Sequence, residues 1–168
     1  MIMPTSKARK EVCINATRIA ENINGINALD VSGAVARLME QVWNTSNFLK
    51  AHCPGFENAT FAGMAPRVGI RETRRIRGQY VMTQEDVLAC KHFDDAIAVA
   101  SYPIDIHRPA DDGCTLIWCG DCYDIPYRSL VPQKIGNLLV AGRSISATHE
   151  AMGAIRVMAT CMAMGEAA

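Results

Sequence analysis

The residues best able to do chemistry gather near the C-terminus, where an apolar run, a short polar turn and a second apolar run follow one another. Residues 137–142 predict a buried strand, and a helix is expected to start near Gly153. In open α/β sheets, ligands bind beyond the carboxyl ends of the strands, where a helix N-terminus offers free amides. His149 and Arg156 flank this turn. The pattern indicates either a site for an anionic or electron-rich group or an ordinary strand–helix connection.

A second candidate is the arginine-rich segment between residues 67 and 77, in which Glu72 is the only acid. Arginine offers a planar fork of donors that suits carboxylate and phosphate groups. If the segment is extended, Arg71 and Arg75 share one face and Arg74 points the other way. The segment either binds an anion or is a solvated face that pairs with scattered acids.

Two further stretches place reactive side chains in extended loops, which commonly carry function. Residues 102–107 (YPIDIH) contain Asp105 and His107, and residues 124–128 (DIPYR) contain Asp124, Tyr127 and Arg128. His107 could act as an acid or base near neutral pH, or it could be an ordinary hydrogen-bonded histidine. The sequence contains no Ser/His/Asp nucleophile motif, P-loop or GxGxxG.

Cys119 and Cys122 form a CxxC, Cys114 and His107 lie upstream of it, and Cys90 and His92 form a second pair. Such a pair suits a zinc knuckle or a redox disulfide, but no second CxxC accompanies it. Incidental reduced thiols are the alternative, and we predict no metal site.

The first third of the chain precedes all of these reactive residues. It contains a short strand-like core within residues 11–18 and a turn-rich stretch at 22–30. Apolar residues at helical spacing then predict a helix over 31–49. Asp30 or Ser32 could cap its start, and Pro54 cannot continue it.

Shorter elements should follow, because turn signals and prolines divide the rest of the chain. The expected elements are a strand at 80–82, a short helix capped by residues 83–86, further helix at 94–100, an extended segment at 102–109, a turn at 111–113, a strand at 114–119 and a hairpin turn at 120–121.

The last helix, expected from about Gly153 to the end, has apolar residues all around its axis and should be buried on every side. A helix that is buried on every side needs more protein around it than one strand and one helix can supply. In addition, residues 165–168 carry no C-cap signal. We therefore expect a fragment, or a chain that a partner covers.

Composition excludes several classes of protein. The chain has 168 residues, 49% of them hydrophobic, which excludes a disordered chain and fits one domain or part of one. The net charge of zero and the 6% aromatic content argue against nucleic-acid or anionic-membrane binding. Without a signal peptide or a transmembrane run, we expect a cytoplasmic protein with reduced cysteines.

Taken together, several stretches resemble the C-terminal portion of a family of FAD-dependent oxidoreductases, in the family's own order. They are NATR (15–18), PGFENA (54–59), GIRETRRIRGQYVMTQEDVL (69–88), SYPIDIH (101–107), IPYRSLVP (125–132) and NLLVAGRSISATHEAMGAIRVMATCMAMGEAA (137–168).

The resemblance implies an α/β fold class, here an α+β fragment of a two-domain flavoenzyme. Residues 1–136 would be substrate-domain and connecting elements. Residues 137–168 would be the last strand and helix of the FAD-binding domain. The family's GxGxxG unit has no counterpart in the sequence.

The resemblance also implies residue roles. Catalytic candidates are His149, Arg156, Arg71 and His107. FAD, the implied cofactor, would contact Gly142, Arg143, Ser144, Ile145, Ala154, Ile155, Arg156 and Val157. The last four would form a helix start under the flavin pyrimidine, whose amides would stabilise negative charge on the reduced flavin. Substrate candidates are Arg71, Arg74, Tyr127 and Arg128.

The leading hypothesis is thus part of a flavoenzyme that passes hydride from a small organic substrate to flavin. Expected partners are a small-molecule substrate and either a missing N-terminal half or a second copy, with no nucleic acid and no membrane. The alternatives are a non-catalytic fragment that needs a partner chain and a small CxxC thiol or zinc module.

Overall fold

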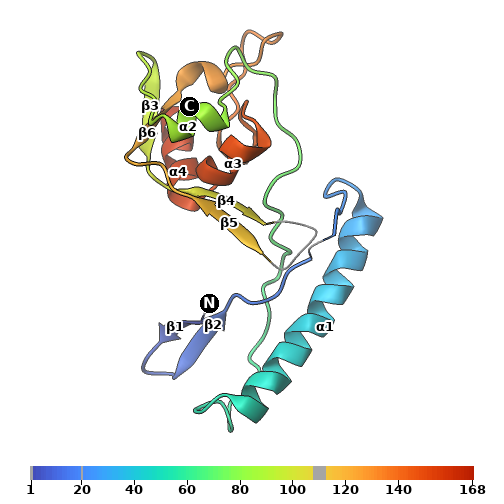
Figure 1. Ribbon diagram of the computed structural model, residues 1–168. Helices are drawn as coiled ribbons and strands as arrows, with labels where there is room; N and C mark the ends of the chain where they lie inside the picture. The colour runs from blue at the N-terminus through green and yellow to red at the C-terminus, as the bar shows by residue number, and fades with distance from the viewer. Residues whose placement is uncertain (1, 20, 108–112) are drawn as a thin grey trace. The chain divides into compact units, whose positions relative to one another are not determined.

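The computed structural model describes residues 2–19, 21–107 and 113–168, and it divides into two compact units, Met1–Gly69 and Ile70–Ala168 (Figure 1). Small antiparallel sheets and four helices make up the described chain. This mixture confirms the α+β class expected from the sequence. None of the described helices is long and apolar enough to cross a membrane.

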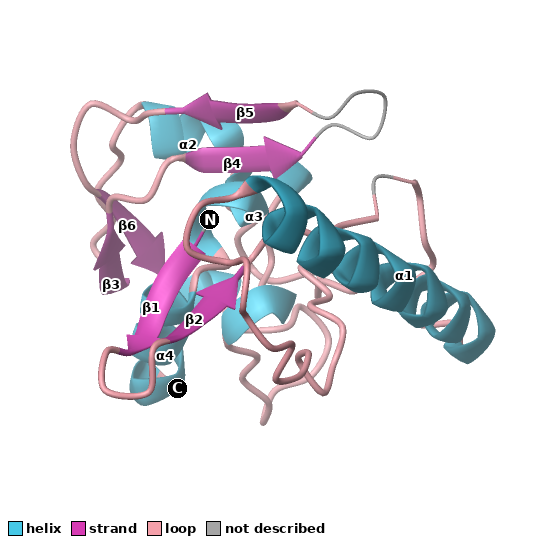
Figure 2. Cartoon of the chain, turned by 90° about the horizontal axis from the view of Figure 1, so that it is seen from below, coloured by secondary structure: helices cyan, strands magenta, loops and turns pink. Residues whose placement is uncertain are grey.

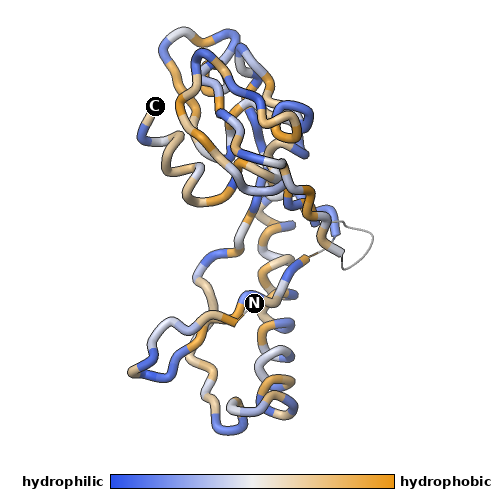
Figure 3. The backbone as a smooth tube through the Cα atoms, turned by 60° about the vertical axis from the view of Figure 1, so that its left-hand side comes forward, coloured by the Kyte–Doolittle hydropathy of each residue, from blue (hydrophilic) through white to orange (hydrophobic). Residues whose placement is uncertain are grey.

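The first unit begins with an antiparallel hairpin of β1 (Ile2–Ser6) and β2 (Glu11–Ile14) and continues into the long helix α1 (Ala28–His52). The helix and its end before Pro54 confirm the prediction, but the predicted caps Asp30 and Ser32 are wrong. Asn27 is the N-cap instead, and its side chain accepts a hydrogen bond from the Leu29 amide at 2.9 Å. Hydrophobic and hydrophilic residues alternate along α1 (Figure 3).

The second unit contains the strand pairs β3 (Ala96–Ala100) with β6 (Tyr123–Pro126), and β4 (Ile104–His107) with β5 (Cys114–Ile117). The prediction of helix at 94–100 is wrong, because residues 96–100, which include the β-branched Ile97 and Val99, pair antiparallel with β6. The hairpin turn at 120–121 is also wrong, since β5 pairs back with β4 (Figure 2). The strand at 114–119 is confirmed as β5. The predicted turn at 111–113 lies mostly outside the described residues.

The short helix α2 (Gln84–Leu88) confirms the predicted capping sequence. Thr83 accepts a hydrogen bond from the Asp86 amide, and the Asp86 carboxylate accepts one from the Thr83 amide. The strand expected just before it, at 80–82, is wrong: residue Met82 makes only an isolated bridge to Ala147.

Residues 137–142 do not form the buried strand that the apolar run predicts. Asn137 and Leu138 are exposed, and the Val140 amide donates to the Leu130 carbonyl at 2.9 Å outside any named strand. A fully buried parallel strand needs neighbours on both edges, and every pairing between named strands of the described chain is antiparallel. The stretch instead leads into a 3-10 turn at Gly142–Ser144.

The C-terminal apolar run forms two helices instead of one. Helix α3 (His149–Ile155) starts at the N-cap Thr148, and α4 (Met158–Ala167) starts after Val157. A helix start at Gly153 is therefore wrong. Gly153 lies inside α3, where a Cβ would come 3.1 Å from the Asp105 carbonyl oxygen, so its lack of a side chain lets α3 pack closely on β4.

The main hydrophobic cluster lies in the second unit and includes the buried apolar residues of α3. Its largest fully buried side chains include Met82, Ile104, Tyr123, Ile125, Leu130, Ile145, Met152, Ile155 and Met164. Five consecutive residues of α3, from Ala151 to Ile155, are buried, and the last three of them lie in the stretch for which the sequence predicted burial. The same prediction is wrong for α4 in this chain, because its Met158 and Met162 side chains are exposed.

Candidate functional site

The break between α3 and α4 places Arg156 against β4 of the same unit. Its guanidinium Nη2 donates to the Asp105 carbonyl oxygen at 2.6 Å and lies 4.0 Å from the Asp105 Oδ2 atom. Arg71 reaches the same Oδ2 with its Nη1 atom at 3.5 Å. Two guanidinium groups therefore converge on one carboxylate, although Arg71 and Arg156 are 85 positions apart in the sequence.

Glu72 extends this arrangement, because it follows Arg71 directly and pairs with the Nδ1 atom of His149 on α3. The Arg75 Nη1 atom lies 3.4 Å from the other Glu72 carboxylate oxygen. We call Arg71, Glu72, Asp105, His149 and Arg156 the charged cluster. It brings together three of the four residues that the sequence proposed as catalytic.

The electrostatics of the charged cluster centre on Arg156, whose side chain is only 11% exposed. Burial lowers the pKa of Arg156, and the nearby Arg71 lowers it further, while Asp105, Glu72 and Tyr102 act in the opposite direction. An arginine pKa lies so far above neutral that Arg156 keeps its positive charge at pH 7 even with its pKa lowered by burial. Arg156 is largely buried and Arg71 is about half exposed, and both lie beside the Asp105 carboxylate. Two neighbouring guanidinium groups of this kind suit the binding of an anion.

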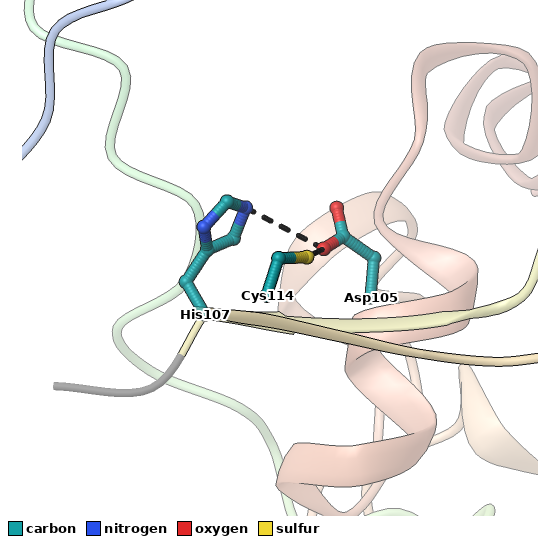
Figure 4. Close-up of side chains that lie close together, drawn as sticks. All are labelled: Asp105, His107 and Cys114. Atoms are coloured by element: carbon teal, nitrogen blue, oxygen red, sulfur yellow. Dashed lines mark hydrogen bonds and ion pairs between the residues drawn. The ribbon is translucent and has the colours of Figure 1, made fainter. Parts of the chain in front are cut away.

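His107, the fourth catalytic candidate, lies on β4 beyond the other oxygen of Asp105. Its Nε2 atom is 3.4 Å from Asp105 Oδ1, and the Cys114 thiol on β5 lies 2.9 Å from the same oxygen (Figure 4). Among the described residues, these three form the one group of His, Cys, Asp or Glu side chains whose spacing suits a metal ion. The sequence predicted no metal site and included neither Asp105 nor Glu72 among the site residues, although residues 105 and 107 lie on the same face of a strand.

The residues expected to contact FAD divide into two groups. Gly142 has a φ of +73°, with nothing within 4 Å of the position a Cβ would take, and the Arg143 guanidinium donates to the Ile70 carbonyl oxygen. Ser144 and Ile145 carry this turn into the core: the Ser144 carbonyl accepts from the Ile76 amide at 3.0 Å, and Ile145 is fully buried.

The second group, residues 154–157, lies at the junction of α3 and α4. The expectation that these residues form a helix start is wrong, because Ala154 and Ile155 are the last residues of α3 and Arg156 is its C-cap. Both lie inside the core, where the Ala154 carbonyl accepts a hydrogen bond from the Tyr123 hydroxyl. Val157 is the N-cap of α4 and offers no side-chain cap. The first amides of α4, next to exposed Met158, are therefore uncapped by a side chain. This helix start fits an electron-rich group such as the flavin pyrimidine edge.

The remaining substrate candidates lie away from these contacts. Arg128 is bound by two hydrogen bonds to the Asp95 carboxylate, at 2.9 and 3.1 Å. That pairing lowers the pKa of Asp95. Tyr127 lines a separate depression of about 400 Å³ together with Leu138 and Leu139. Arg74 is exposed and takes no part in the contacts of the charged cluster.

The CxxC cysteines do not belong to the metal-like group. Burial raises the pKa of the Cys119 thiol, and desolvation and the neighbouring Asp121 raise that of Cys122. A raised pKa disfavours the thiolate that metal binding or thiol exchange needs. None of the seven cysteines, all of which lie in the described part of the chain, forms a disulfide bond.

Comparison with known proteins gives one match. A family model described as FAD dependent oxidoreductase matches residues 2–168, which is nearly the whole chain. Comparison with curated proteins and with solved structures gives no match.

Proposed function

The chain belongs to the family of FAD-dependent oxidoreductases, and from this premise we propose that it forms the substrate side of a site that passes hydride from a small organic substrate to flavin. The match over residues 2–168 carries the proposal. The convergence of Arg71 and Arg156 on Asp105 supports it, because an arginine pair beside a helix start is a reasonable place for an anionic substrate.

The residues present fit the flavin end of FAD. The uncapped amides at the start of α4 would hold the pyrimidine edge, with the open backbone at Gly142 nearby in the same unit. Bound flavin supplies the redox chemistry by accepting the hydride. The side chains of the protein would bind the substrate and accept the proton that the substrate loses.

Arg156 is the best-positioned group for substrate binding. Its hydrogen bond to the Asp105 carbonyl fixes the guanidinium, and its burial strengthens any charge-assisted bond to a carboxylate or hydroxyl group. Arg71, which is half exposed, could close on the same substrate group from the solvent side. When the substrate binds, Arg71 and Arg156 would each give up part of their contact with Asp105 and contact the substrate instead.

His149 is the favoured proton acceptor. Its contact with Glu72 uses the Nδ1 atom, so the Nε2 atom is the one that can take a proton from the substrate. Glu72 orients the ring and offers a compensating negative charge once the proton is taken. His107 is held instead in the group with Asp105 and Cys114.

The test is a visible absorbance spectrum of the purified chain before and after addition of FAD, followed by gel filtration. We expect a flavin band that stays with the protein. A Gly142→Val variant should lose the band, because a β-branched residue is strained at positive φ. Gly33→Ala, in α1 with open space around it, is the matched control. A cooperatively melting chain that retains no flavin would contradict flavin binding by this chain alone.

A second candidate is a chain that needs a partner to complete its cofactor site. The absence of GxGxxG from the sequence and the exposed Met158 and Met162 on α4 favour it. The same gel-filtration experiment separates the two, since this candidate predicts no flavin on the purified chain alone. A chain co-expressed with one that carries a GxGxxG unit should instead elute with it at a higher mass and retain flavin.

A further inference from the structure

The hairpin of β4 and β5 carries three potential metal ligands on one face. His107 and Cys114 are directly opposed in the antiparallel register, and Asp105 lies two residues before His107 on the same strand. Side chains two apart on a strand point to the same face, and opposed residues are neighbours across the pair. Figure 4 shows the imidazole, the thiol and the carboxylate turned toward one another.

The distances match a small coordination sphere. The Asp105 Oδ1 atom lies 3.4 Å from His107 Nε2 and 2.9 Å from Cys114 Sγ, and all three ligand atoms lie within 4.8 Å of one another. A tetrahedral zinc ion, with bonds of about 2.0–2.3 Å, holds its ligand atoms roughly 3.3–3.8 Å apart. Small side-chain adjustments are enough to reach that geometry.

We propose that Asp105, His107 and Cys114 form a Zn²⁺ site with an open fourth position for water. One thiolate, one imidazole and one carboxylate are a ligand set typical of zinc, since calcium and magnesium prefer oxygen ligands alone. The proposal goes beyond the flavin function and does not depend on it.

Binding involves an exchange of cations without oxidation or reduction. The Cys114 thiol now contacts Asp105 Oδ1. Zinc forms a bond to Sγ while the S–H bond breaks, and the proton leaves to solvent. The site therefore gains one net positive charge for each ion bound.

The two oxygens of the Asp105 carboxylate face different groups. Its Oδ2 atom faces Arg71 at 3.5 Å and Arg156 at 4.0 Å, which leaves Oδ1 to the metal. Their contacts orient the carboxylate as outer-shell partners of a metal site do. Their positive charges also oppose the incoming ion, so bound zinc should loosen Arg71 and Arg156 from Asp105.

The experiment is a Co²⁺ titration of the full chain after treatment with a chelator. Cobalt substitutes for zinc and reports thiolate ligation by a charge-transfer band and tetrahedral geometry by visible bands. We expect both, saturating at about one ion per chain and abolished by added Zn²⁺. Cys114→Ser should remove the charge-transfer band, and His107→Ala should weaken binding about tenfold or more.

Cys122→Ser is the matched control and should keep the full spectrum, because Cys122 lies outside the group of three. Circular dichroism melts check that each variant is folded. A wild-type chain with no charge-transfer band, or a band that survives Cys114→Ser, would overturn the proposal and leave the three side chains as a hydrogen-bonded trio.

Discussion

At the scale of single residues, Asp105 is the centre of the second unit's chemistry. One of its carboxylate oxygens faces two arginines and the other faces a histidine and a thiol. Its carbonyl oxygen fixes Arg156 at 2.6 Å. This one residue therefore joins the proposed substrate side to the proposed metal site, and changes at either are expected to reach the other through it.

The residue-scale prediction concerns anion binding by Arg156. An Arg156→Lys variant keeps the charge but loses the planar fork, so small carboxylates such as malonate should bind about tenfold more weakly, the effect of roughly 1.4 kcal/mol. Binding is measured as the rise in melting temperature with ligand concentration. Arg74→Lys, in an exposed position outside the charged cluster, should bind like the wild type. Equal weakening in both variants would remove Arg156 from the anion site.

At the scale of elements, the packing of α3 on β4 sets the geometry of the charged cluster. Helix α3 positions His149 at its start and Arg156 just after its end, while β4 presents Asp105. Gly153 allows the close approach, since a Cβ there would meet the Asp105 carbonyl oxygen at 3.1 Å and an Ile106 carbon at 3.2 Å. The site thus depends on a glycine that does no chemistry.

We predict opposite effects for two glycine substitutions in neighbouring helices. Gly153→Ala should lower the free energy of unfolding by about 1–3 kcal/mol because it overpacks the contact with β4. Gly165→Ala, in α4 with open space around it, should raise that free energy by up to about 1 kcal/mol through helix propensity. Denaturant unfolding measures both. A Gly153→Ala chain as stable as the wild type would contradict the close contact.

At the scale of the whole molecule, burial is distributed unevenly between the two units. The core residues all lie between Met82 and Met164, within Ile70–Ala168. Helix α1 of the first unit buries only Ala34 and Leu49 among its described residues and exposes Leu29, Trp43 and Phe48. Stability should therefore come mainly from the second unit, which also carries both proposed sites.

The corresponding prediction is that a chain of residues 70–168 folds without the first unit. It should melt cooperatively and keep the near-ultraviolet circular dichroism of a packed core, whereas residues 1–69 should show helix signal without a cooperative transition. Circular dichroism melts of the two pieces and of the full chain make the comparison. A non-cooperative 70–168 piece would show that its core needs the first unit.

Local signals in the sequence were enough to predict several features. The long helix α1, the capping box at Thr83 and the strand β5 each depend on side chains close together in the chain, as turn, cap and period rules require. The family resemblance was confirmed by the match over residues 2–168. The sequence also named Arg71, His149 and Arg156 as candidates and placed His149 and Arg156 at one turn, but it did not predict that Arg71 and Arg156 meet at Asp105.

Tertiary structure decided the rest, because it depends on partners distant in the chain. Ala96–Ala100 became a strand only by pairing with Tyr123–Pro126, and the apolar run at 137–142 lacked the strand neighbours that would have made it one. The convergence of Arg71, Asp105 and Arg156 requires β4, α3 and an irregular segment to meet. Periodicity reports which face of an element is apolar, but only the packed fold determines which faces meet.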